Sequence, residues 1–230
     1  MINDFKEIYE KYIKSDIKLT EMFNAVDLKA KKLNKKWLFE YAPNLEPGIL
    51  GDTEIDNNYI IIRLCPLEDK EKFKAILIHE LGEADYKLLG LPSIKGDYDK
   101  ISDLPELFSH FHIRRLAEKF KLNGFIDRNL EYSRNFEKVI EKEDWEIITE
   151  MAWALITYQD KNDYIEQQIK SLDEGIKKNI YKVVGIISER PEMNYDKKIL
   201  VGKYKKIIKI LKKNGLSNDI TENLNNQISI

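Results

Sequence analysis

Apolar residues recur with helical spacing over most of the chain. Before residue 36 they predict two helices, one over residues 3–14 with Asn3 as its N-cap and one from about Leu19 to Lys35. After residue 66 they predict helices over residues 69–89, 103–122, 141–158, 164–187 (interrupted near Gly175) and 199–213.

A short β-rich stretch lies between these two groups of helices. Trp37–Tyr41 is rich in aromatic residues and Tyr59–Leu64 in β-branched ones, which favours strands. Gly51-Asp52 and the Asp-Asn-Asn sequence after residue 55 are typical of turns. We therefore expect a small sheet of two or three strands between Trp37 and Cys65. Because the β-rich part is confined to one stretch, the pattern predicts an α+β fold with a mostly helical C-terminal half.

The domain organisation expected from this pattern has three parts. A core that holds the sheet is predicted over residues 1–125, and a helical region over residues 126–216 is expected to pack on it. Residues 217–230 are polar and predict a tail without a defined element.

The composition of the chain excludes some classes of function. Of the 230 residues, 43% are hydrophobic, and 38 Lys and Arg against 40 Asp and Glu leave a net charge of −2. This balance provides no overall basic field, so we expect no dedicated nucleic-acid binding. The single cysteine, Cys65, excludes a disulfide framework. We expect a cytoplasmic protein, because residues 1–12 have no signal-peptide core and no apolar run is long enough to span a membrane.

The residues best suited to bind a metal ion or transfer a proton lie on the helix predicted over residues 69–89. The three histidines of the chain, His79, His110 and His112, all fall within 34 residues, and histidine is the commonest metal ligand. On that helix His79 and Glu83 lie one turn apart, so both side chains can reach one cation. Glu80 lies about 100° round the helix, where its carboxylate can accept a proton from a metal-bound water.

This helix resembles the active-site helix of zincin metallopeptidases, whose signature is His-Glu-x-x-His. The layout of residues 37–122 is similar to that of the ImmA/IrrE-like peptidases. The similarity rests on four segments, Pro47–Gly51, Tyr59–Ile62, Lys70–Phe73 and Ile78–Gly82. It implies a zinc-dependent peptide-bond hydrolase in which His79 and Glu83 bind zinc and Glu80 is the catalytic base. A peptide substrate or partner is then expected along an edge of the sheet.

The resemblance also implies a third ligand on a later helix, here the one predicted over residues 103–122. Glu106, His110 and His112 are the candidates. Glu106 and His110 share a face one turn apart, which makes His110 our choice. Glu106 also suits a capping box with Asp103, and His112 also suits a packed position in the core.

Glu83 departs from the family pattern, because the signature has its second histidine there. A carboxylate binds zinc at similar distances, so the residue can remain a ligand. A site with one imidazole fewer than the signature could also favour a cation other than zinc, or bind the metal weakly. The alternative to an enzyme is therefore a catalytically degenerate zincin-like module that binds metal or another protein.

Two further helices have structural interpretations. The helix over residues 141–158 has an inward face that includes Trp145, Ile148 and Ala152, which is typical of core packing. The helix over residues 199–213 has six lysines and no acidic residue. Basic amphipathic helices can bind membranes, nucleic acids or acidic partners, but we interpret this one as a surface helix with its lysines in water.

Overall fold

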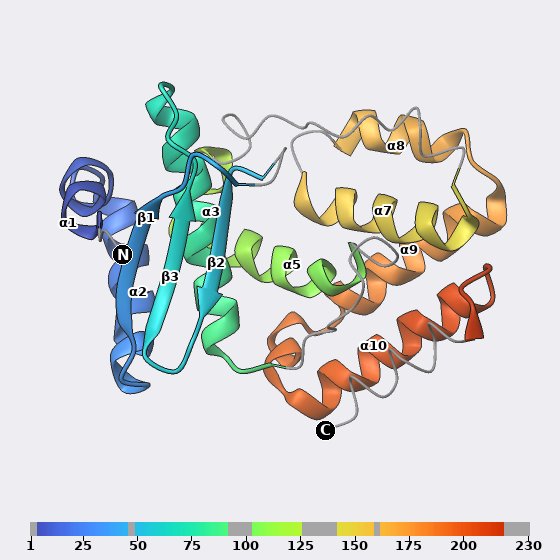
Figure 1. Ribbon diagram of the computed structural model, residues 1–230. Coiled ribbons are helices and arrows are strands. Elements are labelled where there is room, and N and C mark those ends of the chain that lie inside the picture. Colours follow the sequence, from blue (N-terminus) through green and yellow to red (C-terminus); the bar gives the residue numbers. More distant parts are fainter. Residues whose placement is uncertain (1–3, 46–48, 92–102, 126–141, 159–161, 219–230) are drawn as a thin grey trace. The chain divides into compact units, whose positions relative to one another are not determined.

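The protein consists of two compact units. The computed structural model describes residues 4–45, 49–91, 103–125, 142–158 and 162–218. One unit comprises residues 1–90 and 112–132, and the other comprises residues 91–111 and 133–230. The α+β prediction is confirmed, since a small mixed sheet lies in the first unit and the C-terminal half is mostly helical (Figure 1).

The sheet has β3 (Tyr59–Leu64) at its centre, parallel to β1 (Lys36–Tyr41) and antiparallel to β2 (Gly51–Ile55). The two predicted strands are confirmed. The prediction of a turn at Gly51-Asp52 is wrong, because β2 begins there. On the face away from the helices, the Asp52 and Glu54 carboxylates bind the Arg63 guanidinium of β3 at 2.7 and 2.9 Å. This cross-strand pairing compensates for the low strand propensity of the segment.

Helices α2 (Ile17–Lys32) and α3 (Lys70–Leu88) cover the other face of the sheet (Figure 1). The first predicted helix is present as α1 (Phe5–Ile8), which continues as the π-helical segment η1 (Tyr9–Ile13). Its N-cap is Asp4, and the predicted cap Asn3 lies outside the described residues. The amide of Asp4 donates to Phe39 O of β1 at 2.8 Å, so the N-terminal segment covers that edge of the sheet.

The second unit is built around α7 (Asp144–Thr157), which packs on α8 (Asn162–Lys170), α9 (Glu174–Ser188) and α10 (Lys197–Lys212). A 3-10 helix, η4 (Pro191–Tyr195), connects the last two. Trp145, Ile148 and Ala152 of α7 are buried, as predicted. The interruption predicted near Gly175 occurs at residues 171–173, just before α9.

Helix α5 (Asp103–Lys119) belongs to both units, because the division falls between residues 111 and 112. Its later residues Leu116 and Ala117 join the core of the first unit, whereas Phe108 contacts Tyr204 of α10 in the second, with ring centroids 4.7 Å apart. Among the described helices, none is both long and apolar enough to cross a membrane.

Candidate functional site

Helix α3 carries three of the four candidate site residues, His79, Glu80 and Glu83. The helix begins after Asp69, whose carboxylate accepts two backbone amide hydrogen bonds at 2.9 and 3.0 Å. It continues without interruption for 19 residues. His79 and Glu83 therefore lie one turn apart, as their spacing predicted, and both are half-buried.

The carboxyl group of Glu80 is buried between α3 and β2. Glu80 is 5% exposed, and the Thr53 hydroxyl lies 2.7 Å from its Oε2 and 3.1 Å from its carbonyl oxygen. On the same face of β2, Gly51 leaves room for the side chain, because a Cβ there would lie 2.5 Å from Glu80 Oε1. Two residues of β2 thus fix the position of the acid group, one by a hydrogen bond and one by having no side chain.

Burial determines the protonation of this group. Desolvation raises the pKa of Glu80 to about 8, and the negative charge of Glu83 adds to the rise, while Thr53 and Lys87 oppose it. Glu80 therefore carries a proton at pH 7. Burial also lowers the pKa of His79, an effect that the charge of Glu83 counteracts in part. The imidazole is thus neutral at pH 7, which is the form that binds metal ions.

Lys87 connects Glu83 to the edge of the sheet. Its Nζ lies 2.8 Å from Glu83 Oε2 and also donates to the backbone carbonyl of Thr53. Burial alone would lower the pKa of Lys87, but the Glu83 carboxylate outweighs it, and the pKa lies above its ordinary value. Lys87 is therefore an ammonium ion that neutralises Glu83 and occupies one acceptor of β2.

Strand β2 directs part of its backbone outward. The amide of Cys65 donates to Leu50 O at 2.9 Å, and the amide of Asp56 donates to Tyr59 O at 3.0 Å. In an antiparallel pair such bonds alternate along the strand, so the backbone groups of Gly51, Thr53 and Ile55 face away from β3. Within the described part of the chain, β2 pairs with β3 alone. The outward-facing edge thus begins directly beside the Glu80 carboxyl.

His110, the predicted third ligand, lies on the part of α5 that belongs to the second unit. Its Nε2 is 3.5 Å from a carboxylate oxygen of Glu106, one turn earlier on the same face, as the sequence analysis expected. Its Nδ1 is 3.4 Å from the Thr157 hydroxyl, and its ring lies 5.2 Å from that of Trp153. His110 is therefore a buried side chain that packs on α7.

His112 lies in the first unit and has a structural partner there. Its Nε2 lies 2.9 Å from the carboxylate of Asp85, which is 1% exposed and also binds the Lys29 ammonium at 2.7 Å. Burial would raise the pKa of Asp85, but the His112 and Lys29 contacts outweigh it and lower the pKa. This arrangement corresponds to the packed role that the sequence left open for His112.

Three residues were not predicted to belong to the site: Gly51, which was expected in a turn, and Thr53 and Lys87. Lys87 follows Glu83 by four residues, so the usual ion-pair spacing on a helix could have identified it. Gly51 and Thr53 could not be assigned in the same way. Their role depends on which face of β2 meets α3, and that follows from strand register.

The donor set on α3 matches part of a zinc site. A catalytic zinc uses three protein ligands, and His79 with Glu83 provides an imidazole and a carboxylate one turn apart. No group of three or more His, Cys, Asp or Glu side chains among the described residues is arranged to hold a metal ion. A complete site therefore requires a ligand beyond these two. Comparisons of the chain with protein-family models, with curated proteins and with solved structures found no match.

Proposed function

We propose that the protein is a zinc-dependent hydrolase that cuts peptide bonds. The observation that carries this proposal is the placement of the Glu80 carboxyl. It is buried against strand β2, on the helix that presents His79 and Glu83 one turn apart. A proton-transferring group, two donors of zinc-binding type and an outward-facing strand edge are thereby close together.

In this proposal His79 and Glu83 are two of the zinc ligands. Zinc, when bound, would supply Lewis acidity and lower the pKa of a bound water to about 7. With the positive charge of zinc nearby, Glu80 would be ionised, and its carboxylate would accept the proton of the attacking water and return it to the leaving amine. The Thr53 hydroxyl, 2.7 Å from Glu80 Oε2, would keep the carboxyl oriented for both transfers.

The position of the β2 edge favours a peptide as the substrate in this proposal. An extended peptide can add to an exposed strand edge through main-chain hydrogen bonds. The backbone groups of Gly51, Thr53 and Ile55, which face away from β3, would form such hydrogen bonds beside Glu80. Lys87 already donates to Thr53 O, so a bound peptide would have to replace this contact or run past it.

A non-catalytic binding module is the second candidate, and the Lys87 contacts favour it. The ammonium lies 2.8 Å from Glu83 and also binds Thr53 O. The charge of Glu83 is thus compensated by the protein itself. In such a module the edge of β2 would bind a peptide without cleaving it.

Substitution of Lys87 distinguishes the two candidates, because the ammonium competes with a cation for Glu83. If Glu83 is a ligand, Lys87→Gln should raise zinc affinity at least tenfold in isothermal titration calorimetry, and Glu83→Ala should abolish stoichiometric binding. Lys70→Gln, an exposed position on the same helix, is the matched control and should leave the affinity unchanged.

Turnover is measured with a mixture of fluorogenic peptides in the presence of zinc. Glu80→Gln should retain zinc and lose turnover by a factor of about 10² or more, since general-base catalysis contributes on that order. Equal zinc binding by Lys87→Gln and wild type, together with no cleavage by either, would favour the binding module.

A further inference from the structure

The basic residues of this chain are concentrated on one helix. Residues 197–213, which comprise α10 and its C-cap, contain eight lysines and no acidic residue. The remaining 30 Lys and Arg of the chain are outnumbered by its 40 Asp and Glu. Although the net charge of the whole chain is −2, this helix is strongly basic and the rest of the chain is acidic.

Seven of the eight lysines in residues 197–213 lie on the solvent-exposed side of the helix. The opposite side is buried in the second unit and consists of Leu200, Lys203, Tyr204, Ile207, Ile208, Ile210 and Leu211. The exposed lysines are Lys197, Lys198, Lys205, Lys206, Lys209, Lys212 and Lys213. Because the apolar side is already packed against the protein, α10 cannot insert it into a membrane. The lysines provide an electrostatic surface only.

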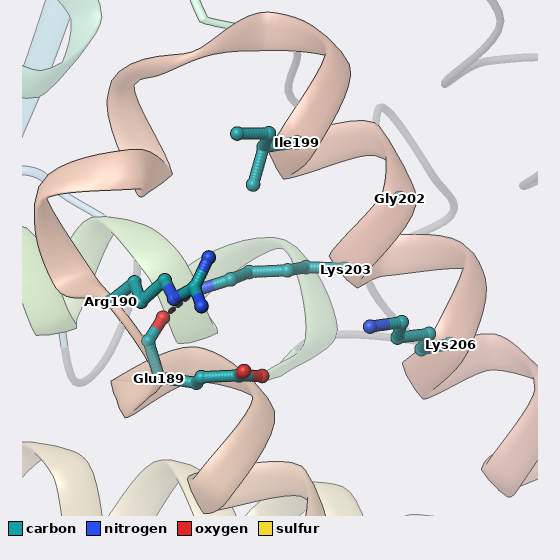
Figure 2. A pocket seen from close by; sticks show the side chains of 6 residues that line it. All are labelled: Glu189, Arg190, Ile199, Gly202, Lys203 and Lys206. Carbon is teal, nitrogen blue, oxygen red and sulfur yellow. Dashed lines mark hydrogen bonds between the residues drawn. The ribbon is translucent and has the colours of Figure 1, made fainter.

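One end of this surface opens into a pocket with a volume of about 320 Å³, drawn in Figure 2. Its walls are formed by Glu189, Arg190, Ile199, Gly202, Lys203 and Lys206. Three of these six residues are cationic and one is acidic. Figure 2 shows the Lys203 side chain extending between Arg190 and Lys206. The charge of the lining thus favours an anion.

Lys203 is part of the pocket wall and also holds the end of α9 in place. It is 6% exposed, and its ammonium donates to the carbonyl oxygens of Ile187 and Glu189 and to the Asn194 side chain. These contacts fix a positive charge at the base of the pocket. Arg190 follows with φ of 46°, a backbone conformation that costs energy for a non-glycine residue.

Gly202 keeps the pocket open. A Cβ built at this position meets nothing within 4 Å, so any side chain there would extend into free space at the pocket wall.

We propose that this pocket binds a phosphate group of a nucleic-acid backbone, and that the exposed lysines of α10 bind the phosphates that follow. Arg190 and Lys206 provide the contacts in the pocket. Lys209 and Lys213 follow Lys206 at intervals of three and four residues on the same side of the helix. A repeating anion fits this row better than a single small phosphate compound, which would fill the pocket and leave the row unused.

Fluorescence anisotropy with a 20-nucleotide labelled DNA, single-stranded and as a duplex, tests the proposal at 50 and 200 mM salt. With three phosphates neutralised, one in the pocket and two along the row, the affinity should fall about 20-fold for the single strand and about 40-fold for the duplex over this range. Inorganic phosphate and anionic phospholipid vesicles are titrated separately. No DNA binding at 50 mM salt would overturn the proposal. So would equally tight binding to the vesicles, or binding of inorganic phosphate without binding of DNA.

Two pairs of variants test whether DNA binds at this pocket specifically or is attracted by any positive charge on the surface. Arg190→Gln/Lys206→Gln should weaken binding at least tenfold at 50 mM salt and reduce the salt dependence by about a third. Lys178→Gln/Lys182→Gln removes the same charge from an exposed face of α9 and should change the affinity less than twofold. Equal effects of the two double variants would contradict the proposal.

The second pair of variants changes the shape of the pocket and leaves the net charge of the protein unchanged. Gly202→Leu fills the pocket and should weaken DNA binding about tenfold. Gly185→Leu, at a position on α9 where a Cβ likewise meets nothing within 4 Å, should have no effect. Unchanged binding by Gly202→Leu, with circular dichroism confirming that it folds, would exclude the pocket as the phosphate site.

Discussion

The raised pKa of Glu80 predicts a specific pH dependence of stability in the metal-free protein. The group has a pKa of 4.5 when exposed and about 8 in the fold. Below pH 4.5 both folded and unfolded chains carry the proton, and Glu80 has no pH-dependent effect on stability. Between these two values the unfolded chain releases the proton while the folded chain keeps it, so the free energy of unfolding decreases as the pH rises.

The Glu80→Gln variant removes this titration and keeps the size of the protonated side chain. The stability difference between the variant and wild type should therefore grow with pH. Each pKa unit corresponds to about 1.4 kcal/mol, so the pH-dependent part should rise from about 1 kcal/mol at pH 5 to about 3 kcal/mol at pH 7, in favour of the variant. Taking the difference at each pH cancels the titration of the other groups.

Urea unfolding in EDTA, followed by circular dichroism from pH 5 to pH 8, measures this difference. Hydrogen exchange at the amides of β3 reports on the first unit by itself. Thr53→Val provides a second variant, because loss of the hydroxyl removes a contact that lowers the pKa of Glu80. In that variant the decrease in stability should extend to higher pH. A constant difference between Glu80→Gln and wild type over the whole range would refute the raised pKa.

Two further substitutions test how the structure holds the site and the basic helix. Gly51→Ala should destabilise the protein by about 1–3 kcal/mol, because its Cβ would lie 2.5 Å from Glu80 Oε1. Gly124→Ala, where the new Cβ meets nothing within 4 Å, is the control in chemical denaturation. Lys203→Met should cost about 2–4 kcal/mol, since it leaves buried carbonyl groups without their donor. Lys205→Met, at an exposed position of α10, should change the unfolding free energy by less than about 0.5 kcal/mol.

Local patterns were sufficient to predict α3 and β3, but not β2, whose first residues were predicted to form a turn. The one-turn spacing of His79 and Glu83 follows from helical periodicity, and the predicted helix over residues 69–89 is present as Lys70–Leu88. Tyr59–Leu64 is predicted and observed as a strand because its β-branched residues fit a sheet centre. Each of these conclusions depends on residues that are near neighbours in the sequence.

The environment of Glu80 could not be predicted in this way. Thr53 and Gly51 lie 27 and 29 residues before it in the sequence, and they reach the carboxyl only because β2 pairs antiparallel with β3 in one register. A shift of that register by one residue would turn Thr53 away from α3. The burial that raises the pKa of Glu80 is therefore a consequence of long-range packing, which helical spacing alone does not contain.

The Glu83 carboxylate makes contacts that a histidine at this position would not make. A neutral imidazole would not hold the Lys87 ammonium, whereas the carboxylate binds it at 2.8 Å, and Lys87 in turn binds the carbonyl of Thr53 at the edge of β2. The same negative charge contributes to the raised pKa of Glu80. Glu83 therefore couples the protonation of the buried acid to an ammonium ion at the strand edge. Any cation that displaced Lys87 from Glu83 would therefore also alter the charge beside Glu80.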